Sequence, residues 1–218
     1  MSNEQRWAVL QKRVFSRYVA LKLQDVPAVD TTTLEDVCQP GALTGYMLSQ
    51  LVARLADVEP PSGKKCPPGA SKLRVKQIDS MNNALAFVES QGVTQKVKTS
   101  AENVVDGEER PILGLIWAIM SRFEKFGDDD TDLDATASLL MWLRNQTRNF
   151  EGITIKDRPF NKSTIDLVLG ALIAKNRPSL LEYDELRHSG DSVGNFAKIL
   201  AAANRYFGLP AYIEPAEV

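Results

Sequence analysis

Residues 110–126 read RPILGLIWAIMSRFEKF, and this stretch decides the fold class of the chain. It is apolar on nearly every side of a helix, so we expect a helix in the centre of a domain. Pro111 fits the first turn of that helix, where the missing backbone N–H costs nothing. The uncharged part, residues 112–120, is much shorter than the roughly 20 residues that span a bilayer.

Two further long helices are predicted on either side of this segment. Residues 4–23 place apolar side chains at three- and four-residue steps, which is helical spacing. Residues 134–147, DATASLLMWLRNQT, begin with an acidic residue suited to an N-cap. We expect this helix to bury Leu139, Leu140, Trp142 and Leu143.

Shorter helices are predicted at residues 43–55, 80–90, 164–175 and 192–207. Strand alternation is scarce, and residues 59–69, EPPSGKKCPPG, cannot be helix. The predicted class is all-α.

Composition favours a soluble globular protein of the cytoplasm. Hydrophobic residues make up 44% and charged residues 25% of the 218 residues, and the net charge is −2. A pI of about 5.6 disfavours nucleic acid as a partner. Cys38 and Cys66 lack CxxC spacing, and two cysteines are too few for a disulfide framework, which fits a reducing compartment.

Enzyme function finds no support in the residues. One histidine and two unpaired cysteines exclude most nucleophile–base pairs and zinc sites. Neither GxGxxG nor GxxxxGK[ST] occurs, so no phosphate-binding loop is visible and no cofactor or metal is expected.

An acidic stretch, GDDDTDL at residues 127–133, is the predicted boundary between two domains. It lacks the spaced ligands, the turn glycine and the distal glutamate of an EF-hand loop, so we interpret it as a linker. The predicted domains are residues 1–126 and 134–218.

The two halves also echo each other. Residues 83–93, NALAFVESQGV, resemble residues 198–209, KILAAANRYFGL, with a gap of one residue. Ala101-Glu102 follows the first string and Ala216-Glu217 follows the second. This order indicates duplicated domains. Because the first half continues into residues 110–126 while the second stops, we expect the second domain to lack its last core helix.

Several strings, in this order, resemble the tandem calponin-homology actin-binding domains of the α-actinin/spectrin superfamily. In the first half they are Trp7 with QKRVFSRY at residues 11–18, KLRVKQIDSMNNALAFV at 72–88, VDG at 105–107, and LGLIWAI at 113–119 with Arg122-Phe123. In the second half they are LLMW at residues 139–142, ALI at 171–173, RPSLLEY at 177–183 and YFGLP at 206–210. The chain departs from the family where an aromatic–Lys/Arg–Asp–Gly element is expected, at residues 38–41 and 162–166, which suggests a divergent member.

The resemblance implies two domains of about four principal helices each and binding to the side of F-actin without catalysis. It also implies a cytoplasmic place in the actin cytoskeleton or cell cortex, in a protein that crosslinks filaments or organises the cortex. Such a protein could dimerise through regions outside this chain.

The proposed actin contacts begin in the first helix. Residues 5–24 contain five cations and no acidic residue, which suits steering toward an acidic filament, although an ordinary solvated helix face would look the same. Phe15 falls outside the Trp7–Val14–Tyr18 stripe, so we expect it to be an exposed apolar anchor. The resemblance implies actin contacts at Gln11, Lys12, Phe15, Ser16, Lys72, Arg74, Lys76, Leu113, Ile116 and Met120.

Two regulatory sites are implied by the resemblance. Trp117 is expected to stack on a basic partner in the second domain, His188 with Arg187 beside it, and so to hold the module closed. Arg144, Arg148 and Lys156 are candidates for phosphoinositide binding, because arginine suits phosphate. A solvated loop is the alternative for this last group.

One alternative function stays within the family. A calponin-homology module can bind microtubules or a signalling partner instead of actin, and the tandem arrangement favours actin. A helical nucleic-acid binder is disfavoured by the acidic pI.

Overall fold

The computed structural model describes residues 3–31, 34–61, 65–69, 71–94, 98–124, 135–155 and 164–217. Within these ranges the regular structure is helical and contains no strand, so the all-α prediction is confirmed for them. No described helix is both long and apolar enough to cross a membrane.

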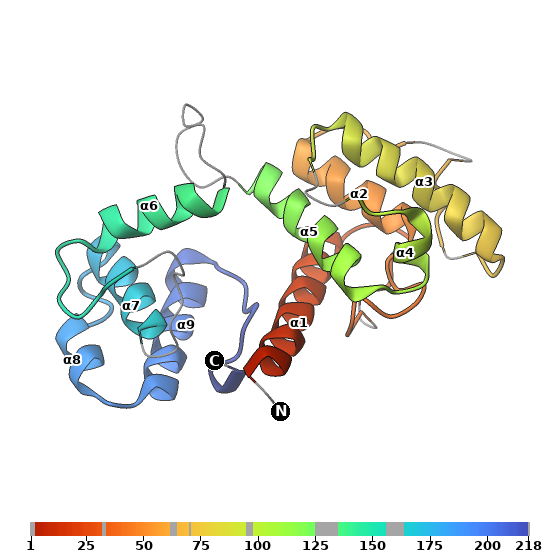
Figure 1. Cartoon of the computed structure of the whole chain (residues 1–218). Helices are drawn as coiled ribbons and strands as arrows, with labels where there is room; N and C mark the ends of the chain where they lie inside the picture. The colour runs from red at the N-terminus through yellow and green to blue at the C-terminus, as the bar shows by residue number, and fades with distance from the viewer. Residues whose placement is uncertain are drawn as a thin grey trace. The chain divides into compact units, whose positions relative to one another are not determined.

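The chain divides into two compact units, Met1–Lys125 and Phe126–Val218. The predicted linker, residues 127–133, lies outside the described residues. Each unit is considered by itself below (Figure 1).

Unit 1 contains α1 (Asn3–Leu23), α2 (Gly45–Ala56), α3 (Arg74–Ser90), α4 (Ala101–Val105) and α5 (Glu109–Phe123). Helix α2 packs on α3, α3 on α4, and α1 on both α2 and α5. Figure 1 shows α5 beside α1. Four α5 side chains at helical spacing have no exposed surface: Ile112, Leu115, Ile116 and Ile119. The central position predicted for this helix is therefore confirmed.

Capping side chains explain where two helices of unit 1, α2 and α4, begin. Thr44 caps α2 by accepting a hydrogen bond from the Met47 amide. Ser100 and Asn103 form a capping box on α4, in which each side chain bonds to the other residue's backbone. Helix α3 begins at Arg74, before the predicted residue 80, without a capping side chain.

Unit 2 contains α6 (Ala135–Thr147), α7 (Ile165–Asn176), α8 (Tyr183–His188), α9 (Ser192–Phe207) and the 3₁₀ turn η1 (Pro215–Glu217). Helix α7 packs on α6, α8 and α9. Its core includes Ile173, Leu186, Ile199 and Ala202. The echoing strings occupy corresponding places, at the C-terminal halves of α3 and α9 and in α4 and η1.

The predicted burial of the α6 side chains is correct in part. Leu140 and Leu143 are 7% and 4% exposed, whereas Trp142 is 38% exposed. The prediction for Trp142 is wrong because this side chain lies outside the apolar stripe that Leu140 and Leu143 form.

Candidate functional site

The basic residues of α1 in unit 1 include a lysine that carboxylates of the same unit already neutralise. Lys12 Nζ lies 2.7 Å from Glu109 Oε1, at the start of α5, and 3.6 Å from Asp36 Oδ2. The hydrogen bond that Lys12 donates to Glu109, and then the charge of Asp36, raise the pKa of Lys12 against the opposing effect of burial. This position is therefore an ion cluster and not an isolated positive charge.

A second cluster lies further along the same two helices. Lys22 Nζ is 2.7 Å from Glu124 Oε1, and the Tyr18 hydroxyl donates to that same oxygen at 3.0 Å. Burial acts to raise the pKa of Glu124, but the bonds from Lys22 and Tyr18 outweigh it and leave the pKa below its usual range. The first cluster joins α1 to the start of α5, and the second joins α1 to Glu124, which directly follows α5.

Two predicted contact residues of α1 are buried. Phe15 is 5% exposed, so the prediction of an exposed apolar anchor is wrong. Ser16 is 1% exposed; its hydroxyl donates to the Lys12 carbonyl at 2.7 Å and accepts from the Val37 amide at 2.8 Å. Helix α1 is covered on several sides, by α2, α5 and the segment around Val37, which a single-stripe interpretation could not show. Gln11 and Lys12 stay partly exposed.

The predicted stripe of α5 is split between core and surface. Ile116 has no exposed surface, so its prediction as a contact residue is wrong. Leu113 and Met120 are partly exposed, and Trp117 is 45% exposed. The accessible face of α5 therefore centres on Trp117.

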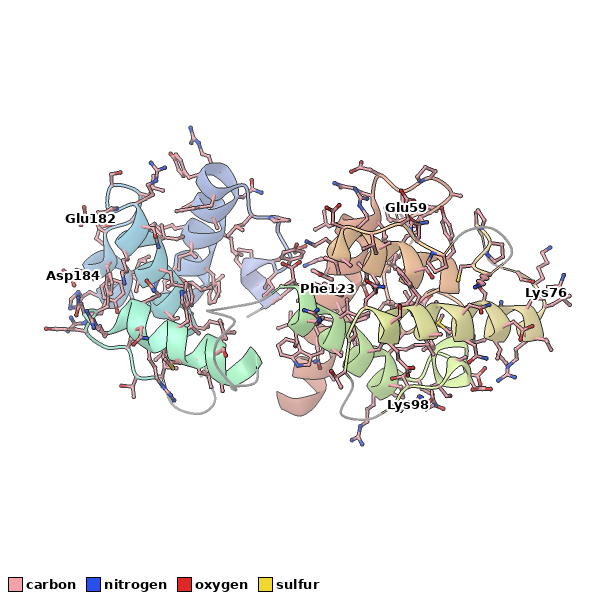
Figure 2. The ribbon with its side chains drawn as sticks, turned by 90° about the horizontal axis from the view of Figure 1, so that it is seen from above. Glu59, Lys76, Lys98, Phe123, Glu182 and Asp184 are labelled. Atoms are coloured by element: carbon pink, nitrogen blue, oxygen red, sulfur yellow. The ribbon has the colours of Figure 1, made fainter. Side chains whose placement is uncertain are left out.

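The N-terminal end of α3 presents the third predicted group. Lys72, Arg74 and Lys76 are exposed, and Figure 2 shows Lys76 at the outer end of the helix. Arg74 makes a two-point ion pair with Asp106, with its Nη2 at 2.7 Å and its Nε at 3.1 Å from the carboxylate oxygens. This hydrogen bond lowers the pKa of the Asp106 carboxyl.

This end of α3 also carries apolar surface that we did not predict. Leu73 and Val75 are 60% and 70% exposed, between the cations. A separate cavity of about 70 Å³ has Lys76, Leu43 and Met81 in its lining. The alternation of basic and aliphatic residues at 72–76 was the sequence signal for this apolar surface. It indicates exposed side chains only once α3 is known to begin at Arg74.

The phosphoinositide candidates in unit 2 are only partly described. Arg144 and Arg148 are exposed, and Arg144 Nε donates to the Ile155 carbonyl at 3.0 Å. Lys156 lies outside the described residues. The phosphoinositide site therefore stays a prediction.

The predicted stacking partners of Trp117 are also exposed. Arg187 Nη1 is 2.6 Å from Glu151 Oε2. His188 Nδ1 lies 2.7 Å from the Asp184 carbonyl, a bond in which the ring nitrogen donates. A contact of either residue with Trp117 would join the two units, and it stays a prediction.

Among the described residues, no group of three His, Cys, Asp or Glu side chains could hold a metal ion. Cys38 and Cys66 are free and buried. Burial, followed by the nearby Asp36 and Glu109 carboxylates, raises the pKa of the Cys38 thiol to about 12.

Comparison with known proteins places these features in a family. The calponin homology (CH) domain matches residues 10–125. Alpha-actinin-4 of Homo sapiens is 34% identical over 159 residues, and alpha-actinin-3 of Mus musculus is 33% identical over the same length. Each alignment covers 72% of this chain and 17% of the relative, so the chain spans less than a fifth of these proteins.

A solved structure shares the fold over a longer range. The actin-crosslinking core of Schizosaccharomyces pombe fimbrin matches with a TM-score of 0.64 at 20% identity, covering 90% of this chain and 43% of that one. At this identity the likeness speaks to the fold alone. The CH match spans more than half of the 218 residues, and the chain therefore belongs to the calponin homology domain family.

Proposed function

We propose that this chain is an F-actin-binding module built from two calponin homology domains in tandem, part of a protein that crosslinks filaments or organises the cell cortex. The observation that carries the proposal is that the CH match falls on unit 1, which bears the candidate surface, in a chain that aligns with alpha-actinins over 72% of its length. The fimbrin fragment with the similar fold is itself described as an actin-crosslinking core. The role needs neither catalysis nor a cofactor, and it belongs in the cytoplasm.

The proposed binding surface is revised by burial. Phe15, Ser16 and Ile116 leave the set because their side chains cannot reach a partner from the core. The remaining members are accessible cations, partly exposed apolar side chains of α5, and one glutamine. They are Gln11, Lys12, Lys72, Arg74, Lys76, Leu113 and Met120.

The chemistry of this set suits a protein partner with an acidic surface. Exposed aliphatic and aromatic side chains supply binding energy once they are desolvated, and cations at the rim steer the encounter. Trp117, 45% exposed, is the largest apolar side chain on α5 that is available for such contact.

Unit 2 is proposed to be the second CH domain, with a regulatory role. Its described elements run from α6 to η1, and its echoing strings lie in α9 and η1 as those of unit 1 lie in α3 and α4. Arg144 and Arg148 are the proposed contacts for phosphoinositide head groups. Co-flotation with vesicles that contain phosphatidylinositol bisphosphate, beside vesicles of phosphatidylcholine alone, tests this lipid contact.

Co-sedimentation with F-actin tests the main proposal. We expect the chain to pellet with filaments in a saturable way at tens of micromolar, and not with microtubules assayed in parallel. A chain that stays in the supernatant with actin would overturn the proposal, and pelleting with microtubules alone would point to the other branch of the family.

A further inference from the structure

Lys12 lies where α1 and α5 meet in unit 1, and two carboxylates lie close to its ammonium group there. Its ammonium group is 2.7 Å from Glu109 and 3.6 Å from Asp36. These two carboxylates come from segments 97 and 24 residues further along the chain, so the cluster forms only through tertiary packing.

The cluster reverses the charge that the α1 sequence presents. One ammonium and two carboxylates leave a net charge of −1. The Glu109 side chain is 54% exposed, whereas that of Lys12 is 22% exposed, so an approaching partner meets the carboxylate more readily than the ammonium. An acidic surface would be repelled at a position where the sequence alone offers attraction.

We propose that Glu109 is a positioning residue that weakens filament binding by holding Lys12 in an internal ion pair. This inference rests on the proposed function. An acidic group of the filament must replace Glu109 at the Lys12 ammonium, and it gains only the difference between two similar pairs. The affinity of the module is thereby kept below what its α1 cations would provide.

Glu109→Gln tests the inference, because it removes the charge and keeps the shape. Partly exposed ion pairs contribute modestly, so we expect binding to F-actin to tighten about 2- to 5-fold. Glu108→Gln is the matched control. Glu108 is the exposed neighbour that precedes α5, makes no side-chain capping bond, and gives the same change in net charge. It should leave the affinity within about 1.5-fold of the parent, since an exposed charge outside the Lys12 ion pairs is largely screened by salt.

The dependence on Lys12 is tested by a double-variant cycle. Lys12→Met should weaken binding, and Glu109→Gln added to Lys12→Met should have no further effect, because the released ammonium is then absent. Glu109→Ala is a second way to remove the carboxylate with a residue of high helix propensity, should the glutamine variant fold poorly. Thermal unfolding of each variant confirms that the measured protein is native.

The outcomes separate the inference from the function on which it rests. Equal tightening by Glu109→Gln and Glu108→Gln would reduce the effect to net charge and overturn the inference while leaving actin binding intact. Weaker binding by a folded Glu109 variant would also overturn it, since Glu109 would then be a contact. If the parent chain does not pellet with actin, the proposed function fails and the inference fails with it.

Discussion

Gly107 closes the turn between α4 and α5 in a conformation that other residues adopt only with strain. Its φ angle is +79°, and a Cβ atom built there would lie 2.5 Å from the Cys38 carbonyl oxygen and 2.9 Å from the Pro40 nitrogen. Both neighbours are backbone atoms, which cannot move aside as the end of a flexible side chain can. The position therefore needs a glycine for two independent reasons.

Gly107→Ala should lower the free energy of unfolding of unit 1 by about 2–4 kcal/mol, because it adds steric overlap to left-handed strain. Gly41→Ala is the matched control, since Gly41 has a φ of +76° and no atom within 4 Å of its Cβ position. The control should cost about 1 kcal/mol, from the backbone conformation alone. Urea denaturation followed by circular dichroism measures both, and equal losses would show that the contact with Cys38 is unimportant.

Glu124 predicts a dependence of stability on pH. Its pKa is lowered in the folded state, despite burial, by bonds from Lys22 and Tyr18. A carboxyl with a lowered folded pKa stabilises the protein above its unfolded pKa, near 4.5, and loses this contribution as the pH falls through the folded value. Because its side chain is 36% exposed, solvent screens the pair and the contribution at neutral pH should reach only about 1 kcal/mol.

Glu124→Gln should therefore reduce the melting temperature at pH 7, and the difference from the parent should shrink below about pH 4. Glutamine can still accept from Tyr18, so the comparison isolates the charge. Melting curves of the two proteins between pH 3 and 7 measure the effect. A constant difference across that range would assign the loss to packing and not to ionisation.

At the scale of elements, a buried polar network fastens three helices of unit 2. Asn195 of α9 donates to the Asp166 carboxylate of α7 at 3.0 Å and to the Leu186 carbonyl of α8 at 2.9 Å. The Ser189 hydroxyl donates to the Asn195 side-chain oxygen at 3.0 Å. Asp166 and Asn195 are 5% and 3% exposed, so removal of either partner leaves a polar group without water to replace it.

Asn195→Ala should destabilise unit 2 by about 2–4 kcal/mol, because it leaves the Asp166 carboxylate and the Leu186 carbonyl without this donor. The control is Asn176→Ala, at an exposed position where the side chain donates only to the carbonyl one turn earlier. That change should cost less than about 0.5 kcal/mol. Thermal unfolding distinguishes the two, and similar small losses would mean that water or rearrangement satisfies Asp166.

The helices differ in how far the sequence could predict them. The ends of long periodic segments such as α1, α5 and α9 were predicted within a few residues. Their apolar spacing and the residues that bound them indicate the same helix ends. Helices α4 and α8 were not predicted as helices, since five and six residues carry too little periodicity. The start of α3 was missed because its first turn is basic and uncapped.

The candidate site was predicted less well than the helices, for a tertiary reason. A stripe on one helix places residues relative to that helix and says nothing of how many neighbours cover it, so the stripes could not show that Phe15 and Ile116 are buried. Ser16, which the family resemblance implied as a contact, is buried for the same reason. The pairing of Lys12 with Glu109 joins residues 97 apart and depends on the packing of α1 on α5. The family resemblance supplied the segments, and the packing decided which of their side chains are available.

At the scale of the whole molecule, each compact unit has buried apolar residues of its own. The α5 isoleucines and Leu115 lie in unit 1, and the cluster around Ile199 lies in unit 2. A unit with its own hydrophobic core can unfold as its own cooperative transition. We therefore expect the thermal unfolding of the full chain to contain two transitions instead of one.

The substitutions Gly107→Ala in unit 1 and Asn195→Ala in unit 2 assign these transitions. In differential scanning calorimetry, Gly107→Ala should lower the temperature of one transition and leave the other within about 1 °C, and Asn195→Ala should do the reverse. A loss of 2–4 kcal/mol corresponds to a shift of roughly 8 °C or more for a domain of about 100 residues. A single transition that both substitutions move together would contradict the expectation. It would mean that the units stabilise each other.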